Sequence, residues 1–167
     1  MGEIKSTLDL IMERTKNLSM SPEEKEENRR QEWLKKAKGW IQRFLDDLVS
    51  SEKVQEELFS SAPPQEWQGL LKKELVDGLE PGRNNESRLL LMERLLNISK
   101  APYREILLSF DKRVEAEGER QKVGLIELWA KEGISGSALV PNLEGDPLWK
   151  VFYEEAAKDS KEKMAEL

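Results

Sequence analysis

Apolar residues recur along most of this chain every three or four positions, which is the period of a helix with one buried face. The first such stripe falls in residues 3–18, and its members are spaced by four, three, four and three: Ile4, Leu8, Ile11, Thr15 and Leu18. We predict an amphipathic helix in residues 1–20. Because its apolar face needs a cover, Ile4, Leu8 and Ile11 are candidates for binding a protein partner or a second copy of the chain.

A second helix is predicted to begin at Pro22. Ser21 and Glu24 have the spacing of a capping box, and proline suits the first position of a helix. The apolar stripe then continues to about Val49 and can be extended to Phe59. A single helix over this whole segment would be about 57 Å long, longer than a domain of this size is wide. The sequence therefore leaves open whether the segment forms one helix or two.

The prolines divide the rest of the chain into further helices, because proline starts helices well and breaks their interiors. The chain has seven of them, at positions 22, 63, 64, 81, 102, 141 and 147. Between them we predict helices over about 65–79 and 87–98, a third that starts near Pro102 and carries its stripe to Leu128, and a last helix that begins at Pro147. The stripe of the third is polar around 116–121, so one long helix or two shorter ones could form there. We favour one helix because no proline intervenes.

The segment 133–147 has the composition of a loop but carries large apolar side chains. It is rich in glycine, serine and proline, and a loop of this length is uncommon in a small helical domain. Its apolar residues fit two interpretations: a lid packed over one end of the bundle, or an arm that binds a partner or a second copy. On the second interpretation the binding residues are Leu139, Val140, Pro141 and Leu143.

These elements predict an all-α fold: a single-domain, irregular helical bundle of about five to seven helices, with one long extended loop over 133–147. Leucine outnumbers isoleucine and valine together, which also favours helix over strand. The helical domain is expected to span 1–153, with residues 1–20 as a candidate oligomerisation arm. Residues 154–167 are almost all polar, and we predict a partly frayed tail.

Composition removes several classes of function. The chain contains no cysteine and no histidine, which excludes disulfides, thiol nucleophiles, Ser–His–Asp triads and metal sites built on thiolate or imidazole. No cofactor is expected. The longest uninterrupted apolar run has only four residues, Leu89–Met92, so we predict no membrane segment. Because the N-terminus also lacks the apolar region of a signal peptide, the expected compartment is the cytoplasm.

Carboxylate pairs offer the one remaining route to metal chemistry. Glu23, Glu24 and Glu27 lie within one turn of each other on the second predicted helix, and Glu74 and Asp77 form a similar pair farther along. Such pairs share a helix face and can bind Mg²⁺ through oxygen ligands. The chain is so rich in acids that pairs of this kind arise by chance. A metal site therefore belongs only to the alternative hypothesis.

Residues 28–43 combine basic side chains with Trp33 and Trp40, a pattern that can bind nucleic acid or an anionic membrane surface. Both tryptophans fall on the apolar arc of the predicted helix, and most of the cations fall outside it. We therefore interpret this stretch as a core-facing helix with a solvated basic back. The net charge of −6 is spread thinly along the chain, and we predict neither a nucleic-acid nor a membrane partner.

The sequence as a whole favours a non-enzymatic cytoplasmic interaction or structural protein. It would act through apolar helix and loop surfaces, with a protein partner or a second copy of itself, so a homo-oligomer is one expectation. The alternative is a Mg²⁺-dependent all-α hydrolase of the nucleoside triphosphate type that uses the helix-borne carboxylate pairs.

Overall fold

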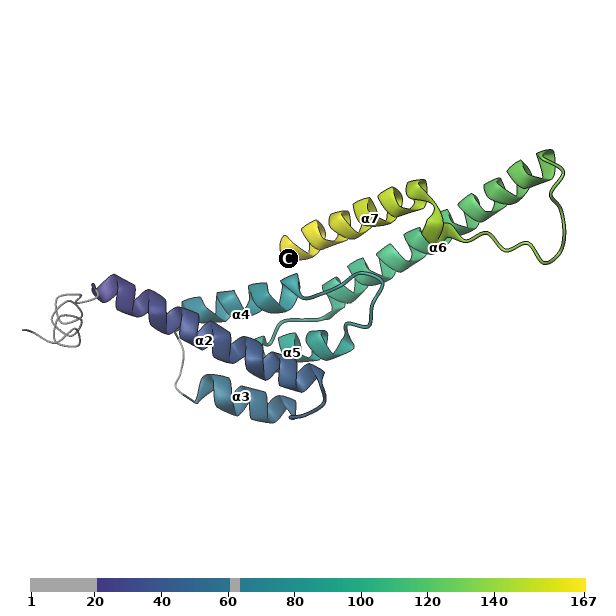
Figure 1. The fold of residues 1–167 in the computed structure, drawn as a ribbon. Helices are drawn as coiled ribbons and strands as arrows, with labels where there is room; N and C mark the ends of the chain where they lie inside the picture. The colour runs from purple at the N-terminus through teal and green to yellow at the C-terminus, as the bar shows by residue number, and fades with distance from the viewer. Residues whose placement is uncertain (1–20, 61–63) are drawn as a thin grey trace, which may run out of the picture.

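The computed structural model describes residues 21–60 and 64–167. Within these ranges the chain is all-α, with no strand, as the sequence predicts (Figure 1). The elements are α2 (Pro22–Leu45), α3 (Ser51–Phe59), α4 (Gln65–Asp77), α5 (Glu86–Leu96), α6 (Ala101–Lys131), the short 3₁₀ helix η1 (Leu143–Gly145) and α7 (Pro147–Ala165). The candidate N-terminal helix, with Ile4, Leu8 and Ile11, lies outside the described residues.

The predicted capping box sets the start of α2. The Glu24 amide donates a hydrogen bond to Ser21 Oγ at 3.1 Å, and the Ser21 amide donates to Glu24 Oε2 at 2.8 Å. The segment that could have formed one helix or two forms two. Asp47 has a φ of 56°, which ends the first helix, and Ser50 Oγ accepts a hydrogen bond from the Lys53 amide to begin α3.

Helices α2 to α5 enclose the main core. In this body α2 lies against α3 and α4, and α5 packs on α3 and α4 (Figure 1). Trp33 ties α2 to both α3 and α4, since its indole Nε1 donates to the Leu58 carbonyl at 3.3 Å and its ring centroid lies 5.5 Å from that of Trp67. The side chains in the centre of the body are apolar and buried: Ala37, Ile41, Val54, Leu58, Leu71, Leu75, Leu79, Leu89, Leu91 and Met92.

A single unbroken helix, α6, leaves this body. It has 31 residues, about 46 Å at 1.5 Å per residue, which confirms one helix rather than two through residues 116–121. Its first part enters the core through Tyr103 and Leu107. Its last buried residue is Gly118, and the remainder of the helix extends beyond the body (Figure 1).

The last helix, α7, returns along α6 and reaches α4 (Figure 1). The rings of Phe110 and Tyr153 meet edge to face, with centroids 5.4 Å apart, and Arg113 forms an ion pair with Asp159 at 3.2 Å. Gly118 lets the two helices approach, because a Cβ there would lie 3.3 Å from the Trp149 ring.

The C-terminal residues differ from the frayed tail predicted for 154–167. They are helical to Ala165, and Ala156, Ser160 and Met164, spaced by four, face inward and are buried. Ser160 Oγ donates to the Ala156 carbonyl at 2.9 Å, so the hydroxyl is satisfied inside the helix. The polar residues lie on the other side of α7 and are solvated. A count of large apolar residues misses this face because two of its three inward positions are small.

The turn between α4 and α5 is fixed by a buried amide. The Glu80 amide donates to Asn85 Oδ1, and Asn85 Nδ2 donates to the carbonyls of Glu80 and Arg83. Gly82 in this turn has a φ of +79°, and a Cβ built there would lie only 2.4 Å from the Tyr153 hydroxyl. The turn therefore requires glycine twice, for its backbone conformation and for the approach of α7.

No helix among the described residues is both long and apolar enough to span a membrane.

Candidate interaction surface

The part of the molecule that exposes the most large apolar side chains is a projecting arm, which we define as residues 119–140. It consists of the end of α6 and the first part of the loop that follows (Figure 1). None of its residues is buried. The body, by contrast, buries apolar residues from each of its helices.

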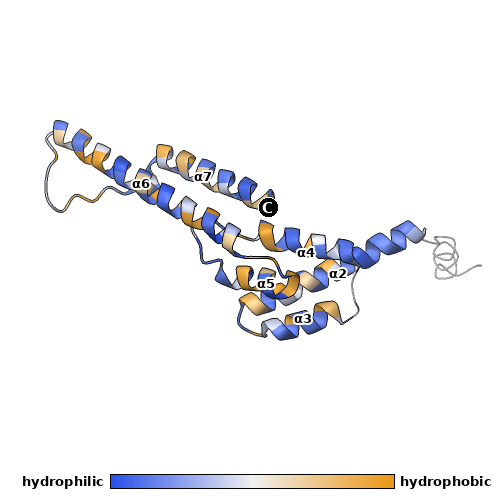
Figure 2. Cartoon of the chain, turned by 180° about the vertical axis from the view of Figure 1, so that it is seen from behind, coloured by the Kyte–Doolittle hydropathy of each residue, from blue (hydrophilic) through white to orange (hydrophobic). Residues whose placement is uncertain are grey.

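Exposed apolar side chains gather on the arm and beside it. Ten large apolar residues of the described chain are exposed, and seven of them fall between 123 and 151. These seven are Val123, Ile126, Leu128, Ile134, Val140, Leu148 and Val151. Figure 2 shows hydrophobic positions along the projecting end of α6, where no other helix lies against them. A surface of this kind marks a contact with another molecule more often than an isolated exposed leucine does.

One side of the arm carries a regular stripe. Val123, Ile126, Ala130 and Ile134 are spaced by three, four and four, and all four are exposed; we call them the outer stripe. Leu125 and Trp129, by contrast, are half-buried. Spacing by three and four places residues on one helix face, as at the seam between two packed helices.

The end of α6 holds Ile134 in place next to this stripe. The Ile134 amide donates to the Trp129 carbonyl at 2.9 Å, and the Gly133 amide donates to the Ala130 carbonyl at 3.1 Å. Gly133 has a φ of +81°, so these two bonds form the Schellman termination of a helix. The stripe therefore continues past the last helical residue without a flexible joint.

The polar residues of the arm balance one another. The arm carries three acidic and three basic side chains, while the chain as a whole has a net charge of −6. Lys122 Nζ contacts Glu119 at 2.8 Å, and Arg120 Nε donates to Glu117 at 2.8 Å. The hydrogen bonds from Arg120 and from Gln121 lower the pKa of Glu117 to about 2. Glu127 and Lys131 make no ion pair within the described residues.

The structure divides the loop residues that the sequence singles out. Pro141 and Leu143 are buried, and Leu143 Cδ1 lies 3.6 Å from the position of a Cβ on Gly118, so this end of the loop is a packed anchor. Leu139 is half-buried, and Val140 is 79% exposed. The lid interpretation thus describes the C-terminal end of the loop, at Pro141 and Leu143. Of the loop residues singled out, only Leu139 and Val140 offer surface to a partner.

Sequence reasoning missed the exposed residues of the helices on either side of this loop. It gave no role to Val123, Ile126 or Ala130. A helical projection of 119–131 could have found them. Its apolar residues cover most of the circumference, more than one neighbouring segment can cover.

The carboxylates of the alternative metal site are not brought together. Glu23, Glu24 and Glu27 are exposed at the start of α2, where Glu24 completes the capping box and Glu27 accepts from Arg30 and Gln31. Glu74 on α4 pairs with Lys38 at 2.9 Å, and Asp77 is exposed. In the part of the chain that the structure describes, no three acidic side chains are grouped so that they could hold a metal ion.

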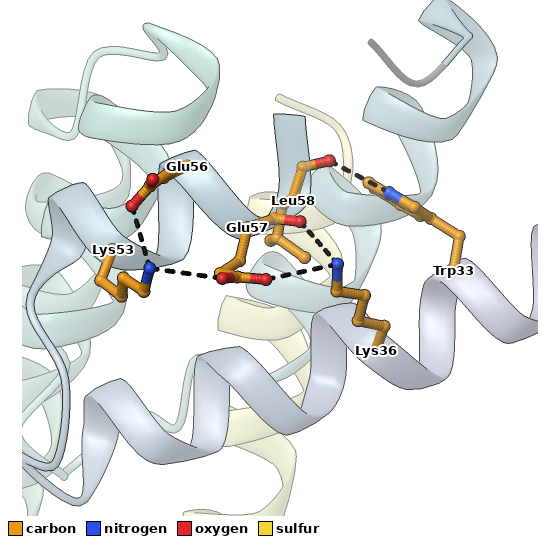
Figure 3. Close-up of polar contacts among 6 residues, drawn as sticks. All are labelled: Trp33, Lys36, Lys53, Glu56, Glu57 and Leu58. Atoms are coloured by element: carbon orange, nitrogen blue, oxygen red, sulfur yellow. Dashed lines mark hydrogen bonds and ion pairs between the residues drawn. The ribbon is translucent and has the colours of Figure 1, made fainter. Parts of the chain in front are cut away.

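The basic residues of α2 are largely engaged within the protein. Lys36 Nζ donates to the Glu57 carbonyl at 2.8 Å and lies 3.5 Å from the Glu57 carboxylate, which also contacts Lys53 (Figure 3). These two cations lower the pKa of Glu57, with the hydrogen bond from Lys53 as the largest cause. The contact of Lys36 with Glu57 joins α2 to α3, whereas Lys53 contacts Glu57 within α3.

The two tryptophans of this stretch also lie as the core-facing interpretation predicts. Trp33 is buried, and Trp40, half-buried, lies under the guanidinium of Arg43 at 5.0 Å. Neither ring is fully open for stacking on a nucleic-acid base.

No protein-family model, curated protein or solved structure matches this chain.

Proposed function

We propose that this protein is a non-enzymatic interaction protein that binds a protein partner through its projecting arm. The observation that carries the proposal is the concentration of exposed apolar side chains on the end of α6, the adjoining loop and the start of α7. The rest of the helical body buries residues of the same kind.

The gain from covering this surface is modest and fits a weak association that depends on concentration. Complete burial of a valine, leucine or isoleucine side chain contributes about 1.5–3 kcal/mol. Val123, Ile126 and Ile134 are 44–54% exposed, so a partner would supply roughly half of that for each. The helical part of the arm is closed by a Schellman turn, and therefore this part loses little conformational entropy when it docks.

The arrangement of polar groups gives less support to the hydrolase alternative. Glu24 caps a helix, Glu27 binds its own neighbours and Glu74 neutralises Lys38. Each of these roles explains the carboxylate without a metal. We therefore retain the interaction function alone as the proposal.

Site-specific photo-crosslinking in the source organism tests the proposal. A photoreactive residue would replace Ile126 on the outer stripe, and the control would carry it at Leu48, an apolar residue 70% exposed in the turn between α2 and α3. We expect a discrete protein adduct from position 126 and none from position 48. Adducts of equal yield from both positions, or none from either, would contradict the proposed function.

A further inference from the structure

We propose that the occupant of the outer stripe is a second copy of this chain, docked antiparallel across a two-fold axis. This inference rests on the proposed function and adds the identity of the partner. It is carried by the spacing of the stripe, by the charges along its edge and by the distribution of charge between the arm and the body.

The stripe has the form of half of a helix pair. Val123, Ile126 and Ala130 lie on one face of α6, and Ile134 is held directly after it by the turn at Gly133. Gly118, which Leu143 and Trp149 approach, lies about 120° around α6 from the middle of the stripe. A second helix can therefore lie along the stripe without displacing α7 or the anchored end of the loop.

The charged residues at the edge of the stripe complement their own copies. At 100° per residue, Glu127 and Lys131 lie about 40° and 80° from Val123, on the same edge of the stripe. Neither has an ion-pair partner within the described chain. In an antiparallel pair, the Glu127 of each copy faces the Lys131 of the other, so the two-fold axis forms two identical ion pairs.

This register also places a glycine opposite Ile134. If position 127 faces position 131, then position 134 faces position 124. Gly124 has nothing within 4 Å of the place where a Cβ would stand. Gly124 lies about 100° from Val123, just outside the edge formed by Glu127 and Lys131, so no side chain at this position obstructs Ile134 of the other copy.

The charge distribution favours contact at the arms over contact at the bodies. The arm has no net charge, so the net charge of −6 resides in the rest of the chain. With the axis beside Trp129, the Gly118 positions of the two copies are about 33 Å apart along the helices, and the bodies lie beyond them. This exceeds the screening length of about 8 Å at physiological salt, so the bodies do not repel one another appreciably.

The contact is small, and we expect a weak dimer that depends on concentration. Each copy offers the surface of about three helical turns. This surface is smaller than the roughly 800 Å² that each partner buries in a standard stable interface. Reversal of a charge at the edge of the stripe should therefore shift the equilibrium between monomer and dimer. Self-association should therefore be measured on the full chain over a series of increasing concentrations.

Charge swaps test the pairing in the full chain by sedimentation velocity. Glu127→Lys alone and Lys131→Glu alone should each weaken self-association by about tenfold, because each places like charges opposite one another. An equimolar mixture of the two variants should associate as strongly as the original chain, and the doubly swapped chain should do the same. Glu154→Lys, an exposed acid on α7 with no ion pair, is the matched control and should change nothing. Circular dichroism would verify that each variant is folded.

Three results would overturn the inference: no self-association of the original chain, single swaps without effect, or a mixture no stronger than its components. Failure here is distinguishable from failure of the proposed function. If position 126 crosslinks a different protein while the chain stays monomeric, the second-copy inference fails and the interaction function stands. If position 126 gives no adduct and the chain is monomeric, both fail.

Discussion

At the scale of single residues, Gly82 shows how one backbone position sets the approach of a helix that is distant in sequence. Its left-handed conformation turns the chain between α4 and α5, and its missing side chain leaves room for the Tyr153 hydroxyl. Tyr153 in turn packs edge to face on Phe110. The contact between α7 and the start of α6 therefore depends on a residue in neither helix.

Replacement of Gly82 by alanine should lower the free energy of unfolding by about 2–4 kcal/mol, measured by urea denaturation. The loss has two sources, backbone strain and the overlap with Tyr153. Gly133→Ala is the matched control, because Gly133 has a similar φ of +81° but nothing within 4 Å of a Cβ. It should cost only about 1 kcal/mol. Equal losses from the two substitutions would contradict a steric role for the Tyr153 contact.

At the scale of elements, helix starts were predictable because their signals are local. The capping box at Ser21 and Glu24 and the prolines at 102 and 147 mark real helix beginnings. The break at Asp47 was not predictable in the same way. An aspartate with a positive φ leaves no pattern in apolar spacing, although Ser50 offers a cap just after it.

Helix α7 was underestimated because its buried face is built from small residues. Ala156 and Ser160 carry no strong hydrophobic signal, yet each is buried, since α6 and α4 approach closely there. The face becomes visible only when its spacing by four is read together with Met164. Periodicity identifies such a face less well than it identifies a row of leucines.

Met164 provides a stability test of this C-terminal helix. It is 1% exposed and belongs to the main core, so Met164→Ala should lower the free energy of unfolding by about 2–4 kcal/mol. Leu167→Ala, three residues later, is the control, because Leu167 is 48% exposed and should be nearly neutral. Thermal or urea unfolding measures both. A neutral Met164→Ala would mean that residues 154–167 do fray, as the sequence alone predicts.

At the scale of the whole molecule, the protein combines a closed body with an uncovered arm. A helical projection of 119–131 shows more apolar surface than one neighbouring segment can cover, but which face stays exposed could not be predicted. It depends on where α7 begins to pack against α6, and that point is fixed by the contact of Trp149 with Gly118 and by Leu143 next to it. Helix α6 continues for 13 residues beyond Gly118, and no other helix of the described chain packs against this end.

The same arrangement explains why the loop resisted a single interpretation. One end of it, at Pro141 and Leu143, is bound to the hairpin of α6 and α7, and the other belongs to the arm. Apolar content alone does not separate an anchor from an exposed surface. The interaction function and the antiparallel pairing both require that the end of α6 stands as a straight helix with its outer stripe open.

A distance measurement along α6 tests that requirement most directly. The chain has no cysteine, so spin labels can be attached to cysteines introduced at the exposed positions Lys112 and Lys131 without any background. Labelled chain would be diluted with unlabelled chain, so that only distances within one molecule are recorded by pulsed electron paramagnetic resonance. We predict one narrow distribution near 28 Å, the length of 19 residues of continuous helix. A broad distribution, or one centred below about 20 Å, would show that the end of α6 folds back and covers its apolar face.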